Sequence, residues 1–246
     1  MARQQEHLGM NKTGVQMSPL ATRHMLDDDK VVSRGTPGDD AAVTHAREAY
    51  IAASGGIGSI PLPATVTGMA GIGLKLLKGG QPQILLDKMA ERLAFERTGT
   101  RLYDALLTKL DVLHDDRDAI THELVAGIRA DEARHVLLMK EAIESMGGDP
   151  TAQTPSADVA GVESLGLVQV MFDPRTSLAQ SLHAILTAEL CDNAGWELLV
   201  ALACEHGHAA LAGRLEDALE QERRHLAMVQ GWYRHAVGLG SGAARI

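Results

Sequence analysis

Two copies of the pattern Glu-x-x-His stand in this chain, and together they predict metal chemistry. The first copy is Glu132 with His135, and the second is Glu222 with His225. Three residues along an α-helix turn through about 300°, so each Glu shares a helix face with its His. A carboxylate and an imidazole at that spacing can hold one metal ion from a single rigid element. One copy alone is weak support, because Glu and His are common on helix surfaces, so the prediction depends on partner carboxylates.

Each copy has a partner carboxylate on the predicted helix before it. Glu96 lies in Leu-Ala-Phe-Glu-Arg and Glu189 in Leu-Thr-Ala-Glu-Leu. An aromatic residue, Tyr103 or Trp196, follows each of them seven positions later, on the same helix face. The chain therefore contains two similar helix pairs, each with Glu on its first helix and Glu-x-x-His on its second.

Four long amphipathic segments predict the helices that position these residues, at about 82–112, 119–146, 177–205 and 209–237. They are rich in Ala, Leu, Glu, Arg and Met, and aromatic residues make up only 3% of the chain, which favours an all-α protein. Pro82 suits a first turn, Ser177 a helix start, and the glycines after Met146 a helix end. The residues 147–176 predict a long crossover with one short helix at about 162–171.

Facing residues of an antiparallel hairpin lie equally far from its turn. In both pairs, the midpoint between the lone Glu and its Glu-x-x-His falls on a polar turn, at residues 114–118 and at 206–207. Two packed hairpins would therefore bring four Glu and two His to one level of a four-helix core.

Apolar neighbours at helical spacing indicate that these acids are buried. Val125 and Ile128 precede Glu132 on its face, and Leu182 and Ile185 precede Glu189. If these acids were surface charges on amphipathic helices, they would lie on the helix face opposite these apolar residues. Four buried carboxylates without cations would be highly unfavourable, which favours a metal site.

In type, order and spacing these six residues resemble the ligand pattern of the ferritin-like di-iron carboxylate superfamily, which includes ferritins, bacterioferritins and rubrerythrins. The resemblance covers about residues 82–237 and implies an all-α, ferritin-like four-helix bundle holding two iron ions. It implies that Glu132 and Glu222 bridge the metals, and that the terminal ligands are Glu96 with His135 and Glu189 with His225. It also implies that Tyr103 lies near the metals as a catalytic-site residue and hydrogen-bonds a carboxylate.

Mixed carboxylate and imidazole ligands suit iron or manganese, and a metal pair can deliver two electrons to O₂ or peroxide. We therefore expect an oxidoreductase that oxidises Fe(II) or an organic substrate with O₂ or peroxide. Three alternatives stay open: iron storage or buffering in an assembly, peroxide dismutation by a manganese pair, and a bundle whose metal has only a structural role.

Some neighbours of the ligands have expected supporting roles. Asp131 and Asp192 are candidates for orienting the imidazoles through hydrogen bonds. Arg134 and Arg224 are expected to point away from the metals into salt bridges, and His122 and His183 fall off the ligand face. Poor helix formers follow both Glu96 and Glu189, including Gly99 and Gly195, which predicts either close helix approach or a local bulge.

We divide the chain into an extended or disordered arm (1–38), short helices with a Gly/Pro-rich loop (39–80) and the bundle (81–240). A first short helix should end near Ala53, and a second should span about 65–78. The apolar stretch 57–77 must be buried somewhere, which suggests a homo-oligomer, most simply a dimer.

The formal net charge of −9 with no basic run argues against a nucleic-acid partner. No apolar signal core or membrane span is recognisable, so we expect a cytoplasmic protein. Cys191 and Cys204 form no CxxC pair and are expected to be buried free thiols.

Overall fold

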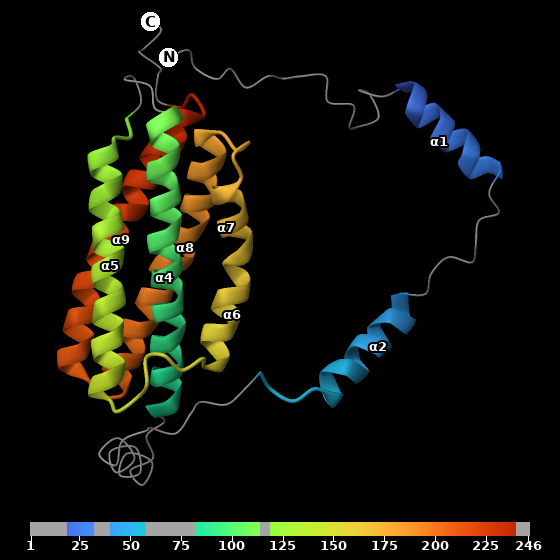
Figure 1. Cartoon of the computed structure of the whole chain (residues 1–246). Helices are drawn as coiled ribbons and strands as arrows, with labels where there is room; N and C mark the ends of the chain where they lie inside the picture. The colour runs from blue at the N-terminus through green and yellow to red at the C-terminus, as the bar shows by residue number, and fades with distance from the viewer. Residues whose placement is uncertain (1–18, 32–39, 58–81, 114–118, 240–246) are drawn as a thin grey trace, which may run out of the picture. The chain divides into compact units, whose positions relative to one another are not determined.

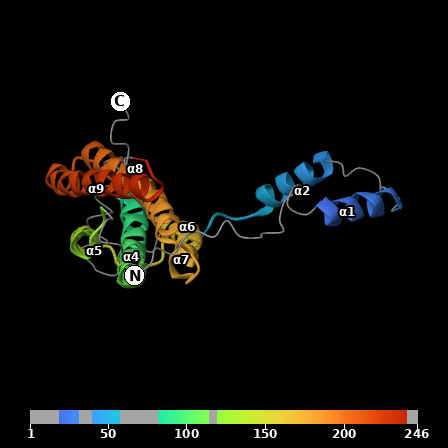
Figure 2. The same ribbon diagram turned by 90° about the horizontal axis from the view of Figure 1, so that it is seen from above.

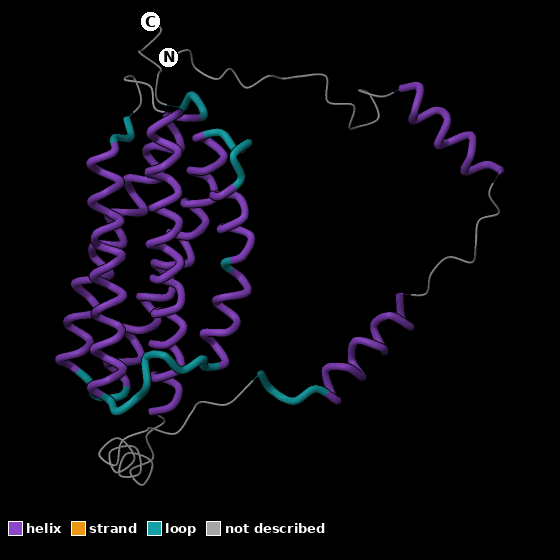
Figure 3. The backbone as a smooth tube through the Cα atoms, viewed as in Figure 1, coloured by secondary structure: helices purple, strands orange, loops and turns teal. Residues whose placement is uncertain are grey.

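The computed structural model describes residues 19–31, 40–57, 82–113 and 119–239, and every regular element in these ranges is an α-helix (Figure 1 and Figure 3). The chain separates into two units. One contains α1 (Pro19–Val31) and α2 (Asp40–Ala53), and the other contains all the remaining helices. The predicted all-α class is confirmed for the described residues.

The second unit is a four-helix bundle made of two antiparallel hairpins. Helix α4 (Pro82–Leu113) packs along α5 (His122–Ser145), and α8 (Leu178–Glu205) packs along α9 (Ala209–Ala236). The hairpins meet through contacts of α4 with α8 and of α5 with α9, and Figure 2 shows the arrangement from above. The bundle expected from the two helix pairs is thus confirmed.

Local sequence explains where the helices begin and end. Ser177 and Gln180 form a reciprocal capping box at the start of α8, and the Thr121 side chain caps α5. Gly147 after α5 and Gly207 between α8 and α9 have φ values of 82° and 75°, which L-residues with a side chain rarely adopt. The predicted turn at 206–207 is confirmed, whereas residues 114–118 lie outside the described residues.

The crossover differs from the prediction, because it contains two helices, α6 (Pro155–Glu163) and α7 (Leu165–Phe172). We expected only the second. Pro155 stands in the first turn of α6, where its missing N–H costs nothing, and the side chain of Thr154 caps that turn. Both helices pack on α4, and α7 also packs on α8. Among the described residues neither of them contacts α5 or α9.

The N-terminal extension also corrects one prediction. The segment Pro19–Val31, expected to be irregular, forms α1 with a proline in its first turn, while α2 ends at Ala53 as predicted. The predicted helix at 65–78 and all but the first residue of the apolar stretch 57–77 lie outside the described residues. The dimer and the domain boundaries therefore stay predictions.

Two apolar clusters fill the bundle, one on each side of a polar layer. The first surrounds Met89, Met139 and Leu215, and the second surrounds Leu106, Ile128 and Ile185. A polar layer between two packed cores is held in place by both of them.

Two simpler expectations concern the cysteines and the membrane. Cys191 and Cys204 are free, as expected, but both are exposed, so the prediction that they are buried was wrong. Each lies on the solvent-exposed side of α8. Within the part of the chain that the structure describes, no helix has the length and apolarity that a membrane crossing requires.

Candidate metal centre

All six predicted ligand residues lie in the polar layer, and each is at most 3% exposed. One comes from α4, two from α5, one from α8 and two from α9: Glu96, Glu132, His135, Glu189, Glu222 and His225. Helices far apart in the sequence therefore bring together the residues that the repeat predicted. Whether these residues suit a metal ion depends on the geometry of their donor atoms.

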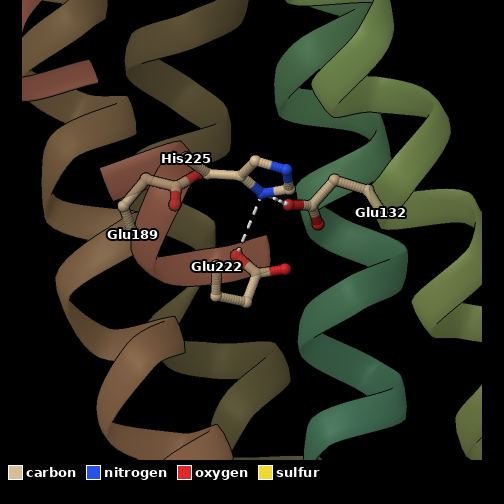
Figure 4. A group of neighbouring side chains, drawn as sticks. All are labelled: Glu132, Glu189, Glu222 and His225. Atoms are coloured by element: carbon tan, nitrogen blue, oxygen red, sulfur yellow. Dashed lines mark hydrogen bonds and ion pairs between the residues drawn. The ribbon is translucent and has the colours of Figure 1, made fainter. Parts of the chain in front are cut away.

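The side chains form two overlapping groups with metal-ligand spacing. Ligand atoms of Glu132, Glu189, Glu222 and His225 all lie within 4.8 Å of one another, and Figure 4 shows these four side chains converging. Ligand atoms of Glu96, His135 and Glu222 do the same. Glu222 belongs to both groups, as a bridging carboxylate should. Glu132 belongs to one group only, so its bridging role stays a prediction.

Buried oxygens of two predicted ligands lack a hydrogen-bond partner. They are Glu96 Oε2 and Glu189 Oε2, whereas His135 Nδ1 and Glu222 Oε1 lie 2.6 Å from each other. A buried polar atom without a partner costs about 1–3 kcal/mol, and more when it carries charge. Both oxygens belong to predicted ligands, so a bound cation would satisfy them. The residues therefore fit a pair of metal ions.

The carboxylates repel one another strongly in the absence of a cation. Burial and the neighbouring charges of Glu96, Glu222 and Glu189 hold the pKa of Glu132 well above its ordinary value. Burial and the charge of Glu222 raise the pKa of Glu189 to about 8. Burial alone would lower the pKa of His135, but its contacts with Glu222 and Glu96 raise it to about 10. Protons therefore take the place of metal charge in the metal-free site.

The aromatic residues of the repeat support the ligand carboxylates reciprocally. Tyr103 Oη on α4 donates a hydrogen bond to Glu189 on α8, and Trp196 Nε1 on α8 donates to Glu96 Oε1 on α4 over 3.0 Å. The contact that the resemblance implied for Tyr103 is confirmed. Burial, followed by the charge of Glu189, raises the pKa of Tyr103 well above its ordinary value, so the phenol keeps its proton.

The outer nitrogen of each imidazole is held across the interface between α5 and α9. His225 Nε2 lies 3.1 Å from Asp131 Oδ2, which confirms the orienting role predicted for Asp131. His135 Nε2 lies 2.9 Å from Gln221 Oε1. We did not predict Gln221, although it precedes Glu222 just as Asp131 precedes Glu132. Aligning the two copies of the motif would have found it.

The other orienting prediction was wrong. Asp192 does not contact an imidazole; its carboxylate pairs with Arg92 Nη1, and its backbone carbonyl accepts from the same atom over 2.9 Å. Both residues are 4% exposed, and Arg92 Nε lies 3.6 Å from Glu96 Oε1. Sequence reasoning missed Arg92, because a single Arg on an amphipathic helix is usually exposed. Its place one turn before Glu96, on the buried face, was the available signal.

Close contacts across the helix interface explain why a glycine follows Glu96 and Glu189 in the middle of a helix. A Cβ atom at Gly99 would lie 2.1 Å from Glu132 Oε2, and one at Gly195 would lie 2.6 Å from Arg92 Nη1. Each glycine leaves room for a charged side chain of the centre. Helices α4 and α8 are continuous α-helices at these positions, so close approach is confirmed and a bulge is not present.

The remaining predictions on neighbouring residues hold. Arg134 pairs with Asp131 Oδ1 at the surface, and Arg224 Nη1 lies 3.9 Å from Glu220 Oε1. His122 lies beside Asp111, and His183 packs on the ring of Tyr233, so neither belongs to the centre.

A surface pocket of about 230 Å³ lies between α5 and α9, and the predicted ligand His135 is among its lining residues. His135 and Gln221 form its inner wall, and Arg134, Arg214 and Asp217 line it further out. Within the described part of the chain, the pocket lies on the side of the bundle that α6 and α7 do not contact.

Comparison with protein-family models and with curated proteins found no match. Among solved structures, a ferritin-like, diiron-carboxylate protein from Bacillus anthracis str. Ames is similar to this chain. The sequences are 18% identical, the TM-score is 0.48, and the match covers 61% of this chain and 96% of the other. A similarity of this size says nothing about the activity of this chain, which has to be inferred from its own side chains.

Proposed function

We propose that this protein holds a pair of iron ions in the polar layer of the bundle and uses them to oxidise Fe(II) or a substrate with O₂ or peroxide. One observation carries the proposal: four buried carboxylates and two imidazoles converge with metal-ligand spacing, and a buried oxygen of Glu96 and one of Glu189 have no hydrogen-bond partner. A bound pair of Fe(II) ions would supply two electrons, which with two protons would reduce one hydrogen peroxide to two waters or one O₂ to hydrogen peroxide.

The residues around the ligands prepare the site for this chemistry. Gly99 lets the Glu132 carboxylate reach the centre, while Tyr103 and Trp196 each hold one oxygen of a terminal carboxylate. Tyr103 keeps its proton beside Glu189 and orients that carboxylate through the hydrogen bond that it donates. The two apolar cores exclude water above and below the polar layer, and the pocket beside His135 offers an entry side for a small oxidant.

Anaerobic titration of the metal-free protein with Fe(II), followed by O₂ and then peroxide, tests the proposal by near-ultraviolet absorbance. We expect saturation at two irons per chain and rapid oxidation, with the faster oxidant identifying the physiological one. The double variant Glu132→Ala with Glu222→Ala should lose binding. Unchanged binding in that variant would refute the proposal. Uptake of many irons per chain would instead identify a storage protein.

A further inference from the structure

We propose that the two metal positions are unequal: the position of Glu189 and His225 binds the first ion tightly, and that of Glu96 and His135 binds the second weakly and exchangeably. This inference depends on the proposed metal centre and describes how it fills. The inequality comes from residues at which the two halves of the repeat differ.

The first difference lies behind the imidazoles. In both histidines Nδ1 faces the carboxylates, at 2.6 Å from Glu222 Oε1 for His135 and 3.2 Å from Glu222 Oε2 for His225. The outer Nε2–H therefore donates away from the centre. His225 donates to the carboxylate of Asp131, whereas His135 donates to the neutral amide of Gln221.

A carboxylate acceptor makes the imidazole a stronger donor to a metal than an amide acceptor does, because it stabilises the charge that the ring gives up. Arg134 binds the other oxygen of Asp131 from the solvent side and fixes its orientation. The imidazole of His225 is therefore the better ligand.

The second difference lies beside the terminal carboxylates. Glu189 accepts from the neutral phenol of Tyr103, but Glu96 faces both Trp196 and the buried cation of Arg92. Asp192 binds Nη1 of the Arg92 guanidinium, and Nε of the same guanidinium faces Glu96. A fixed cation there competes with a metal ion for the Glu96 carboxylate and repels the ion as well.

The third difference is access. The pocket between α5 and α9 is lined by His135 and Gln221, and His225 is not among its lining residues. Among the six predicted ligands, His135 is therefore the one that borders this pocket. Weaker ligands and a pocket beside His135 both favour exchange at this position.

The test is an anaerobic calorimetric titration of the metal-free full chain with Co(II), which needs no oxidant. We expect two binding steps at least about 10-fold apart in dissociation constant, the usual effect of a changed ligand partner. Asp131→Asn should weaken the first step about 10-fold, and Gln221→Glu should tighten the second by a similar factor. Both substitutions keep the size of the side chain.

Two ligand variants assign the steps to positions. Glu96→Gln should keep the tight step and lose the weak one, and Glu189→Gln should do the reverse. Asp217→Asn is the matched control, because Asp217 is an exposed residue of α9 that lines the outer part of the same pocket, and both steps should be unchanged. Thermal unfolding of each metal-free variant verifies its fold.

The outcomes separate this inference from the proposed function. Two equal steps, or loss of the tight step in Glu96→Gln, would overturn the inference and leave a metal pair in place. Absence of any Co(II) binding by the natural chain would overturn both.

Discussion

At the scale of single residues, the centre depends on a glycine that leaves space as well as on the side chains that carry charge. Glu132 reaches the polar layer only because Gly99 has no Cβ to occupy the space of its carboxylate. The atom in conflict is the end of a flexible side chain, so a methyl group would move the carboxylate rather than unfold α4.

We therefore expect Gly99→Ala to lower metal affinity about 10-fold or more while the metal-free protein unfolds at nearly the natural temperature. Co(II) titration and thermal unfolding measure the two effects. Gly127→Ala on α5 is the matched control, because its added Cβ meets nothing within 4 Å. It should leave binding unchanged and stabilise the helix by about 1 kcal/mol. Equal binding by both variants would show that Gly99 is not needed for the approach.

At the scale of helices, the interface between α4 and α8 contains a buried ion pair beside the ligands. Arg92 and Asp192 come from different hairpins, and each offsets the cost of burying the other. Burial raises the pKa of Asp192 well above its ordinary value although the charge of Arg92 acts in the opposite direction.

Arg92→Leu should destabilise the metal-free protein by about 3–5 kcal/mol, because it leaves Asp192 buried without its cation. The double variant Arg92→Leu with Asp192→Leu should be less damaging than Arg92→Leu alone, since both buried charges are gone. Urea unfolding of the natural chain, both single variants and the double variant completes the cycle. A double variant as unstable as the sum of the single ones would mean that the pair has no coupling.

At the scale of the whole molecule, the charges of the centre make stability depend on pH. The pKa of Glu189 is raised to about 8 and that of His135 to about 10. Both groups bind protons more tightly in the folded chain than in the unfolded chain. Their contribution to the free energy of unfolding is complete below the unfolded pKa values of about 4.3 and 6.5, and it is lost as the pH rises through the folded pKa values. Burial raises the pKa of Glu222, but its contacts with His135 and His225 lower it overall. Its contribution to stability is therefore present at neutral pH and is lost only in acid.

The melting temperature of the metal-free protein should accordingly fall between about pH 5 and pH 10. A divalent cation replaces the protons, so the stabilisation that it gives should grow over the same interval. Calorimetry across this range with and without Mn(II) measures both trends. A metal-free melting temperature that rises from pH 6 to pH 9 would contradict this assignment of the buried charges.

Removal of residues 1–81 tests the division of the chain. Every residue of the centre lies within 82–239, so the shortened chain should bind the same two ions with the same affinities. We propose that the extension contributes to self-association, so the shortened chain should elute as a monomer where the full chain elutes as a dimer. Size-exclusion chromatography with light scattering measures the mass, and a dimer of the shortened chain would place the contact on the bundle.

The sequence by itself determined the four long helices, their pairing into hairpins and the six residues of the polar layer. Helical periodicity and the distance along the chain from a turn can both be read from a short stretch of sequence. The repeat shows both features in each of its halves, as with Glu96 and Glu189. The helices α1 and α6 were not predicted, although each begins at a proline, which suits the first turn of a helix.

Only the tertiary structure decided what surrounds the ligands. Arg92 contacts Asp192, Gly99 contacts Glu132 and Gln221 contacts His135 across helix interfaces whose rotation no single-helix pattern fixes. The same periodicity that placed Asp192 near the centre could not tell whether it faces an imidazole or a guanidinium. The difference between the two metal positions arises from these contacts between helices.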